Sequence, residues 1–378
     1  MRRDCEDIGS DRLPYLDILR CLAIFCVVAV HVSDSWVWLS SDYTDNRLQW
    51  WTANLLNSCS RVGVPVFVMV SGALLLHSKR ADAPVAFLRR RFSRIIPALL
   101  LWSVAYAVWT DRVHTGSMPV GDALRAFADG GTYYHLWFLY MIGLLYLVTP
   151  ILRPMVAEGR RALLVYAVVL WAAWVIVLPA AQRALGLYGS GVEIYSFVAY
   201  AGYFVLGALL REARLPRRAL VPVAAVTAGA VWLNALGVAA AVRNAGGSLD
   251  TVDYDLNLSL GAPLLAVGVF VLVKSAPWSR WLPPDSWVAA VAGYVGAASF
   301  FVYLAHPMVM ETLQALVLHG EGGLASLHPG AAIPVETLLV LAACLLLAFP
   351  AAWIAGVARR GAGLAGARAL RAAASMQK

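Results

Sequence analysis

An arginine and a histidine stand eleven residues apart in a long apolar stretch near the start of the chain. Arg20 and His31 belong to the segment LDILRCLAIFCVVAVHVSD. In a helix, at about 100° per residue, the two side chains fall within about 20° of one face and about 16 Å apart along the axis. Ionisable groups are costly in apolar surroundings, so this pair is a candidate for function.

The two residue types suit acyl transfer from a carrier that joins a phosphate to a thioester. An arginine holds phosphate through charge-assisted, often bidentate hydrogen bonds. A histidine can take a proton from a hydroxyl group at neutral pH. The spacing of about 16 Å is comparable to the reach of a pantetheine arm. From spacing alone, an equally good interpretation has Arg20 extend its charge to the polar surface and His31 hydrogen-bond to a neighbouring helix.

Other polar residues are candidates for the same site. Asp34 follows His31 by three residues, so its carboxylate would either orient the imidazole or lie as an ordinary acidic group at the outer rim of the helix. Five more residues are expected to line a cavity for the acceptor, although each also has an ordinary explanation as an ion pair, an interfacial aromatic residue or a satisfied buried histidine: Arg61, His135, Trp137, Tyr140 and His306.

The composition shows what must position these residues. Hydrophobic residues make up 61% of the 378, charged residues only 14%, and the mean hydropathy is +0.70. A soluble protein carries about a quarter charged residues, and a membrane-spanning helix needs about 20 apolar ones. The sequence therefore predicts an all-α, polytopic membrane protein with ten spans: 16–39, 55–77, 92–110, 135–152, 162–180, 194–210, 219–242, 256–273, 288–318 (entering the membrane near Gly293) and 332–357.

The distribution of charge predicts the topology. The net charge is +8 and the pI about 9.4. If the spans alternate from a cytoplasmic N-terminus, the outer loops hold only Arg47, Arg112, Arg125, Arg183 and Arg243 of the 30 basic residues. Basic residues mark cytoplasmic loops, so the excess is a topology signal and not a nucleic-acid surface. We expect a cytoplasmic segment at 1–15, a membrane domain at 16–357 and a basic cytoplasmic tail at 358–378.

The cysteines and the N-terminus exclude other classes. The five cysteines contain no CxxC pair, so neither a disulfide framework nor a metal site is expected. The first apolar run lacks a small-residue cleavage signal after it, and we interpret it as a retained helix. In MVSGALL, Ser71 and Gly72 predict close helix packing rather than a nucleophile.

The inner loop before the third predicted span contains a cluster of arginines. Arg89 and Arg90 are explained by topology and lipid headgroups. Arg94 lies within the apolar run, next to Ile95-Ile96-Pro97, and favours a phosphate contact.

Six segments together resemble the acyltransferase-3 family of bacterial membrane acyltransferases. They are the Arg20/His31 pair in LDILR…VVAVH, RVGVPVFVMVSGALLL, RRRFSRIIP, HLWFLYMIGLLYLVTPIL, YAGYFVLGALL and SFFVYLAHP, in that order. The resemblance implies about ten helices, an acyl-coenzyme A donor from the cytoplasm and a sugar acceptor modified outside. It also implies a central role for Arg20 and His31, and a donor-binding role for the Arg91-Phe92-Ser93-Arg94 motif.

The expected function follows from the chemistry of these residues together with the resemblance to the family. We expect an O-acetyltransferase of the bacterial inner membrane that moves an acetyl group from acetyl-coenzyme A to a lipid-linked or exported polysaccharide, with no bound cofactor. Many members of the family carry a further hydrolase-like domain, and this chain resembles the stand-alone form. Such a form either completes transfer in the membrane or passes the acyl group to a partner, such as a polysaccharide-assembly protein. The alternative is a polysaccharide exporter, but the sequence shows no repeat of the kind transporters often have.

Overall fold

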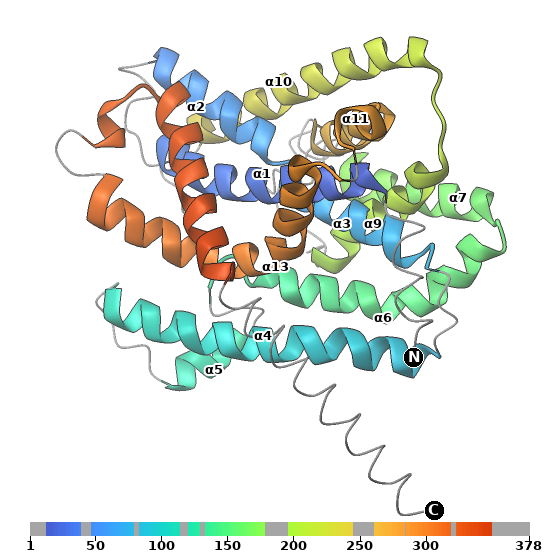
Figure 1. Cartoon of the computed structure of the whole chain (residues 1–378), viewed down its shortest axis with the longest axis horizontal. Helices are drawn as coiled ribbons and strands as arrows, with labels where there is room; N and C mark the ends of the chain where they lie inside the picture. Colours follow the sequence, from blue (N-terminus) through green and yellow to red (C-terminus); the bar gives the residue numbers. More distant parts are fainter. Residues whose placement is uncertain are drawn as a thin grey trace, which may run out of the picture.

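A computed structural model of the chain describes residues 13–38, 47–78, 83–113, 120–128, 133–177, 196–244, 261–283, 285–318 and 323–349. All regular elements within these ranges are helical, and none is a strand. The predicted all-α fold is confirmed (Figure 1). The predicted tail at 358–378 and most of the predicted segment at 1–15 lie outside the described residues.

Seven stretches of helix in the described part of the chain are long and apolar enough to cross a membrane. They are α1 (Pro14–Trp38), α2 with α3 (Arg47–Ser60 and Gly63–Leu75), α4 (Pro84–Val113), α6 (Trp137–Ala157), α10 (Leu220–Asn244), α13 (Trp287–Leu313) and a last helix, Pro329–Phe349. The chain is therefore a polytopic membrane protein, as predicted.

Three other predicted spans coincide with shorter helices. These are α7 (Arg161–Ala172), which continues as a π-helical turn (Ala173–Val177), α9 (Ser196–Glu212) and α11 (Gly261–Ser275). Each is shorter than the roughly 20 residues that a perpendicular span requires. The short helices α5 (Val120–Ala128) and α12 (Trp278–Trp281) complete the set that bears on the fold. The membrane face at which each helix ends stays a prediction from the charge pattern.

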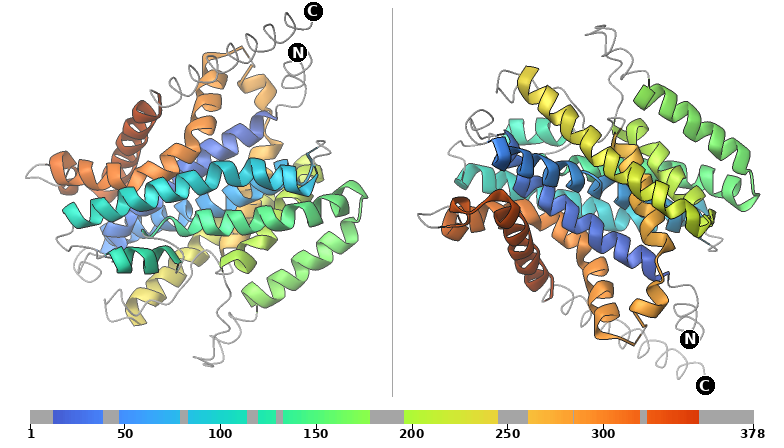
Figure 2. Two further views of the ribbon diagram at one scale, coloured as in Figure 1. Left: turned by 90° about the horizontal axis from the view of Figure 1, so that it is seen from below. Right: turned by 90° about the horizontal axis from the view of Figure 1, so that it is seen from above.

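Helix α1 lies in the middle of the bundle, with α4 and α10 at its edges (Figures 1 and 2). In the most apolar 18-residue stretch of α1, 56% of the stretch is buried inside the protein. The corresponding stretches of α4 and α10 are buried over only 22% and 17% of their length. A helix that exposes apolar side chains on most of its surface is suited to contact with lipid tails. The polar residues of α1 are therefore held among protein helices.

Helices α3 and α9 pack against each other through glycines. A Cβ atom at Gly72 would lie 1.8 Å from the Phe204 carbonyl oxygen, and one at Gly207 would lie 1.9 Å from the Met69 carbonyl oxygen. Only glycine permits such a close approach of two backbones in a membrane. The packing role predicted for Gly72 is confirmed, and α3 gains a fixed position.

Helix α13 lies along α1, and the two run in the same direction. The Cys21 thiol donates a hydrogen bond to the Ala292 carbonyl, and a Cβ atom at Gly296 would contact the Arg20 side chain. About ten residues later, the His31 and His306 rings stack. Arg20 and His31 therefore both face α13. They are eleven residues apart on α1, and the α13 residues that they contact, Gly296 and His306, are ten residues apart.

Helix α13 begins within one residue of the predicted start of the ninth segment at 288, and the expected entry into the membrane near Gly293 stays a prediction. The helix begins at Trp287, because the Ser286 side chain accepts a hydrogen bond from the Ala289 N–H and so caps it. Its first turns point away from the rest of the helix (Figure 2). The second predicted span is longer than expected, since α2 begins at Arg47 and is separated from α3 only by Arg61 and Val62.

Candidate active site

His31 and Asp34 lie one turn apart on α1, and their side chains face each other. The distance from His31 Nδ1 to Asp34 Oδ2 is 3.6 Å, and both side chains are partly exposed, at 24% and 34%. Residues three apart on a helix share a face, so the sequence alone sets this contact. The carboxylate orients the imidazole and offsets the positive charge that the ring gains when it takes a proton.

Asp34 is held from its other side by the end of α2. Asn57 Nδ2 donates to Asp34 Oδ1 over 2.8 Å, and the Arg61 guanidinium approaches the same oxygen at 3.4 Å. Arg61 Nε also donates to Asn57 Oδ1 over 3.0 Å, which closes a ring of three polar side chains. Such a closed network fixes each member, because a buried polar group without a partner is costly. Arg61 therefore both pairs with Asp34 and lies at the predicted cavity.

A second histidine lies against His31. The rings of His31 and His306 are stacked with their centroids 5.3 Å apart, and His306 is fully buried. His306 Nδ1 lies 2.7 Å from the Tyr303 carbonyl oxygen and 3.2 Å from that of Val302. Because carbonyls only accept hydrogen bonds, Nδ1 carries the proton and Nε2 has a lone pair. Among the described residues, His306 Nε2 has no hydrogen-bond partner.

A third histidine, His135, completes the cluster from the turn before α6. Its ring centroid lies 5.4 Å from that of His306, and the residue is 1% exposed. Burial lowers the pKa of His135 to about 3, with a smaller contribution from the charge of His31. The ring is therefore neutral at pH 7 and presents one N–H donor and one acceptor nitrogen.

Aromatic residues and α13 fix the position of His135. The rings of Tyr106, Tyr133, Tyr134 and Tyr303 lie around it, with centroids 4.9 to 5.8 Å from that of the imidazole. The Tyr303 hydroxyl donates to the His135 carbonyl, and the Tyr133 hydroxyl donates to the Glu311 carboxylate of α13. Two hydrogen bonds thus tie the turn before α6 to α13.

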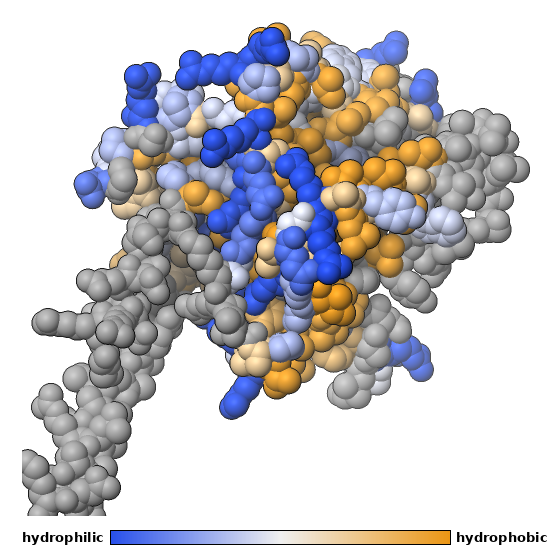
Figure 3. Space-filling view, turned by 90° about the vertical axis from the view of Figure 1, so that its right-hand side faces the viewer, coloured by the Kyte–Doolittle hydropathy of each residue, from blue (hydrophilic) through white to orange (hydrophobic). Residues whose placement is uncertain are grey.

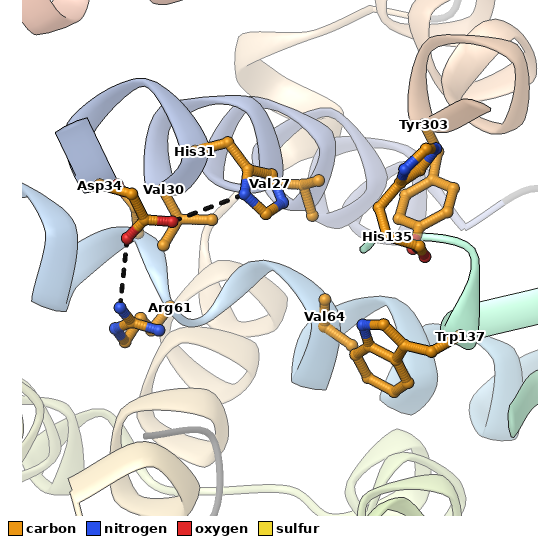
Figure 4. Close-up of a pocket in the computed structure, with 10 residues that line it drawn as sticks. Val27, Val30, His31, Asp34, Arg61, Val64, His135, Trp137 and Tyr303 are labelled. Carbon is orange, nitrogen blue, oxygen red and sulfur yellow. Dashed lines mark hydrogen bonds and ion pairs between the residues drawn. The ribbon is translucent and has the colours of Figure 1, made fainter. Parts of the chain in front are cut away.

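These side chains surround a cavity of about 100 Å³ next to His31 (Figure 4). In Figure 4, His31, Asp34 and Arg61 lie on one side, with His135, Trp137 and Tyr303 opposite them. The complete lining is Val27, Val30, His31, Asp34, Ser60, Arg61, Val64, His135, Trp137 and Tyr303. Of the predicted acceptor residues, Arg61, His135 and Trp137 therefore meet at one cavity with His31 and Asp34.

Two predicted acceptor residues do not line this cavity. His306 lies behind His31, which it contacts through the ring face. Tyr140 does not line this cavity either, and its hydroxyl donates over 2.8 Å to the Phe127 carbonyl, which ties α5 to α6.

The predicted donor-binding arginines gather at the other end of the α1–α13 contact. Arg20 forms an ion pair with Asp17 at 3.2 Å. The Arg91 guanidinium lies 5.5 Å from the ring centroids of both Phe87 and Tyr146, a cation–π arrangement. Arg91 and Arg94 lie one turn apart on α4, and both they and Arg20 of α1 are near enough to Tyr146 of α6 to act on it electrostatically.

Other basic residues nearby have a structural use. Arg153 donates to the Leu75 carbonyl, Arg211 to the Ala73 carbonyl, and the Lys274 ammonium to three carbonyls at the end of α9. Cations stabilise helix C-termini, whose carbonyls lack partners within the helix. Arg94, by contrast, is exposed and makes no hydrogen bond or ion pair within the described part of the chain. Polar side chains gather in the middle of the face shown in Figure 3.

Four residues that shape the two ends of the α1–α13 contact were not predicted from the sequence. Asn57 and Tyr303 hold Asp34 and the His135 turn, Tyr134 meets the His31 ring edge at 5.0 Å, and Tyr146 contacts Arg91. Two signals were present in the sequence. Asn57 is a polar residue near an apolar helix, and Tyr303 lies one turn before His306. No sequence signal distinguishes Tyr134 or Tyr146 from interfacial aromatic residues.

The fold is that of a polytopic membrane protein with a histidine cluster at a cavity, and comparison with known proteins gives its class. A family model described as an acyltransferase domain, that of the acyltransferase-3 family, matches residues 13–357. The chain belongs to this family and is a membrane acyltransferase. No curated protein and no solved structure matches it.

Proposed function

We propose that the protein is an O-acetyltransferase of the bacterial inner membrane. It moves the acetyl group of cytoplasmic acetyl-coenzyme A to a hydroxyl of a lipid-linked or exported surface polysaccharide. The observation that carries this proposal is the arrangement of the α1–α13 contact. A group of arginines lies at one end of it, and a histidine paired with a carboxylate lies in a cavity at the other.

The donor is held at the arginine end. Arg20, Arg91 and Arg94 bind the phosphates of coenzyme A, for which guanidinium groups are suited by charge and geometry. The pantetheine arm then follows the face of α1 over the roughly 16 Å to His31. The acetyl-coenzyme A is a substrate, and the protein needs no bound cofactor for this reaction.

At the His31 end, the acceptor hydroxyl attacks the thioester carbonyl. The hydroxyl oxygen forms a bond to the carbonyl carbon, the carbon–sulfur bond breaks, and the hydroxyl proton passes to His31 Nε2 and then to the leaving thiolate. Asp34 keeps Nδ1 protonated and stabilises the ring while it is charged. In the other form of the mechanism, His31 takes the acetyl group first and the sugar hydroxyl attacks the acyl-imidazole.

Arg61 and His135 contact the hydroxyl group of the sugar that reacts, and Trp137 contacts the acetyl group that this hydroxyl receives. An arginine and a neutral imidazole offer hydrogen-bond donors to hydroxyl groups, and an indole ring offers an apolar face. All three line the cavity with His31. His306 supports the His31 ring from behind.

Radiolabelled acetyl-coenzyme A tests the proposal in membranes from cells that make the protein. Label is expected to enter the lipid-linked or polymeric carbohydrate, and mild base should release it because the product is an ester. The O-acetyl content of surface glycans, measured by NMR, should fall when the protein is removed. An exporter would change the amount of surface glycan and leave acetyl-coenzyme A unconsumed, which would contradict the proposal.

A rapid-mixing experiment without acceptor separates the two forms of the mechanism. A burst of coenzyme A equal to the amount of protein indicates an acyl-histidine. Absence of a burst in a preparation that is active with acceptor indicates direct attack with His31 as base.

A further inference from the structure

The cavity beside His31 has apolar walls and one polar end. Val27 and Val30 of α1, Val64 of α3 and Trp137 of α6 form the walls, and the polar end contains Asp34 and Arg61. The walls come from three separate helices. A group that reacts at His31 and carries an apolar tail would place that tail between them.

The volume of the cavity limits what enters it. A cavity of about 150 Å³ in another protein holds benzene, which has six heavy atoms. By proportion, the 100 Å³ beside His31 accommodates about four. An acetyl group has three heavy atoms, and the attacking hydroxyl oxygen is a fourth. A butyryl group or a whole sugar ring exceeds this space, so the ring must remain at the polar mouth.

Close packing fixes the distance between α1 and α3, which carry the valine walls. A Cβ atom at Gly63 would lie 2.9 Å from both the Ala23 carbonyl oxygen and Val27 Cγ2, so α1 and α3 already touch next to Val64. Val27 is 1% exposed. Protein interiors are close-packed and resist the insertion of extra methylenes, which makes the limit a property of the helix packing.

The indole wall is fixed in the same way. The ring of Trp137 packs against that of Tyr200, with centroids 5.3 Å apart, and Tyr200 is 1% exposed. An aromatic pair of this kind holds its geometry and keeps the indole in place.

A charged acyl group is disfavoured as well. Arg61 is the cation that lines the cavity, and its charge is compensated by Asp34 at 3.4 Å. A succinyl carboxylate would enter an apolar space without a cation of its own, and an unpaired charge there is costly.

We propose that Val27, Val64 and Trp137 set the length of acyl group that the enzyme transfers, and restrict it to two carbons. This inference rests on the proposed function, since it assumes that an acyl-coenzyme A thioester reacts at His31. An acetyl group fits between these side chains, whereas butyryl, hexanoyl and succinyl groups do not.

The test is a series of acyl-coenzyme A donors of increasing length. The full-length protein is used in membranes that contain its native carbohydrate, and release of coenzyme A is followed with a thiol reagent. One methylene in a hydrophobic pocket changes kcat/KM by about 10- to 200-fold. The wild-type kcat/KM for butyryl-coenzyme A should therefore be at least about 100-fold below that for acetyl-coenzyme A.

Enlarged cavities should accept longer donors. In the double variant Val27→Ala/Val64→Ala, the ratio of butyryl to acetyl kcat/KM should rise at least about tenfold. Trp137→Leu should extend the range to hexanoyl. The matched control is Val28→Ala/Val66→Ala, which removes the same atoms from the same two helices at fully buried positions that do not line the cavity. It should leave the ratio unchanged.

The outcomes separate the two proposals. If the wild-type protein releases coenzyme A from none of the donors, the proposed function fails. If it uses acetyl-coenzyme A but accepts butyryl equally well, the inference about the walls is wrong while the function stands. The inference about the walls is also wrong if Val27→Ala/Val64→Ala and the control Val28→Ala/Val66→Ala change the ratio of butyryl to acetyl kcat/KM by the same factor. Thermal unfolding of each variant in detergent shows whether it is folded, and the single variants replace any double variant that is not.

Discussion

The two ends of the α1–α13 contact are built differently. At the His31 end, Asp34, Asn57 and Arg61 form a closed set of hydrogen bonds and ion pairs, and two further histidines lie close by. At the Arg20 end, the predicted donor-binding arginines are held by one ion pair and by aromatic rings, or are exposed.

The difference matches the chemistry proposed for each end. A reacting group has to be fixed to a fraction of an ångström, which a rigid network of hydrogen bonds provides. A phosphate-binding group is effective with looser positioning, because charge attraction falls off slowly with distance. Replacing residues at the His31 end should therefore lower kcat, and replacing residues at the Arg20 end should mainly raise KM for the donor.

The largest effect is expected for His31→Ala. The variant lacks the proton acceptor, so the rate of acetyl transfer should fall by about 10²- to 10⁴-fold. This rate is measured as the transfer of radiolabel from acetyl-coenzyme A to carbohydrate. His328→Ala is the control, since His328 is exposed. Full activity in a His31→Ala protein that is folded and inserted would remove the basis of the proposed mechanism.

A smaller loss is expected for Asp34→Asn. The amide keeps the shape of the side chain but neither offsets the charge on His31 nor pairs with Arg61, so kcat should fall by about 100-fold with KM for the donor nearly unchanged. The control is Asp122→Asn, which alters an exposed carboxylate that also stands three residues from its partner, Arg125. A change confined to KM would place Asp34 outside the reaction.

At the other end of the α1–α13 contact, Arg20→Ala should weaken binding of the donor. A hydrogen bond to a charged group contributes about 1.5–3 kcal/mol, so KM for acetyl-coenzyme A should rise at least about tenfold. The value of kcat at saturating donor should change little. Arg160→Ala is the control, because Arg160 pairs with Glu158 at the surface. An unchanged KM together with a reduced kcat would show that the two ends are not divided in this way.

The smallest effect is expected for Tyr146→Leu. Loss of one cation–π contact with Arg91 costs about 0.5–1 kcal/mol, which corresponds to a two- to fivefold rise in KM for the donor. Tyr166→Leu, at an exposed position on α7, should leave KM unchanged. If the two variants behave alike, Tyr146 does not position Arg91 for binding.

Local periodicity accounts for what could be predicted at the site. Arg20, His31 and Asp34 share a face of α1 because a helix repeats every 3.6 residues, and a sequence contains that information directly. The glycine at position 72 could be assigned to packing for a similar reason, because a small residue in an apolar helix permits backbone contact. The apolar segments were found because a span needs a minimum length.

Contacts between distant segments could not be predicted in this way. Tyr140 and His135 are five residues apart and were both expected at the cavity, yet Tyr140 bonds to Phe127. His135 lies in the turn before α6, and its position depends on Tyr303 of α13. The sequence contains no period that relates these two elements, so their proximity depends on how the helices pack.

By itself, the sequence determined that the chain is helical, that it spans a membrane several times, and that an arginine and a histidine lie on one face of α1. Each of these properties depends on composition or on neighbours within a few turns. The tertiary structure alone decided that α13 covers that face, that three histidines from separate elements meet there, and that the cavity is small. These depend on the packing of side chains that are up to 275 residues apart, as between His31 and His306.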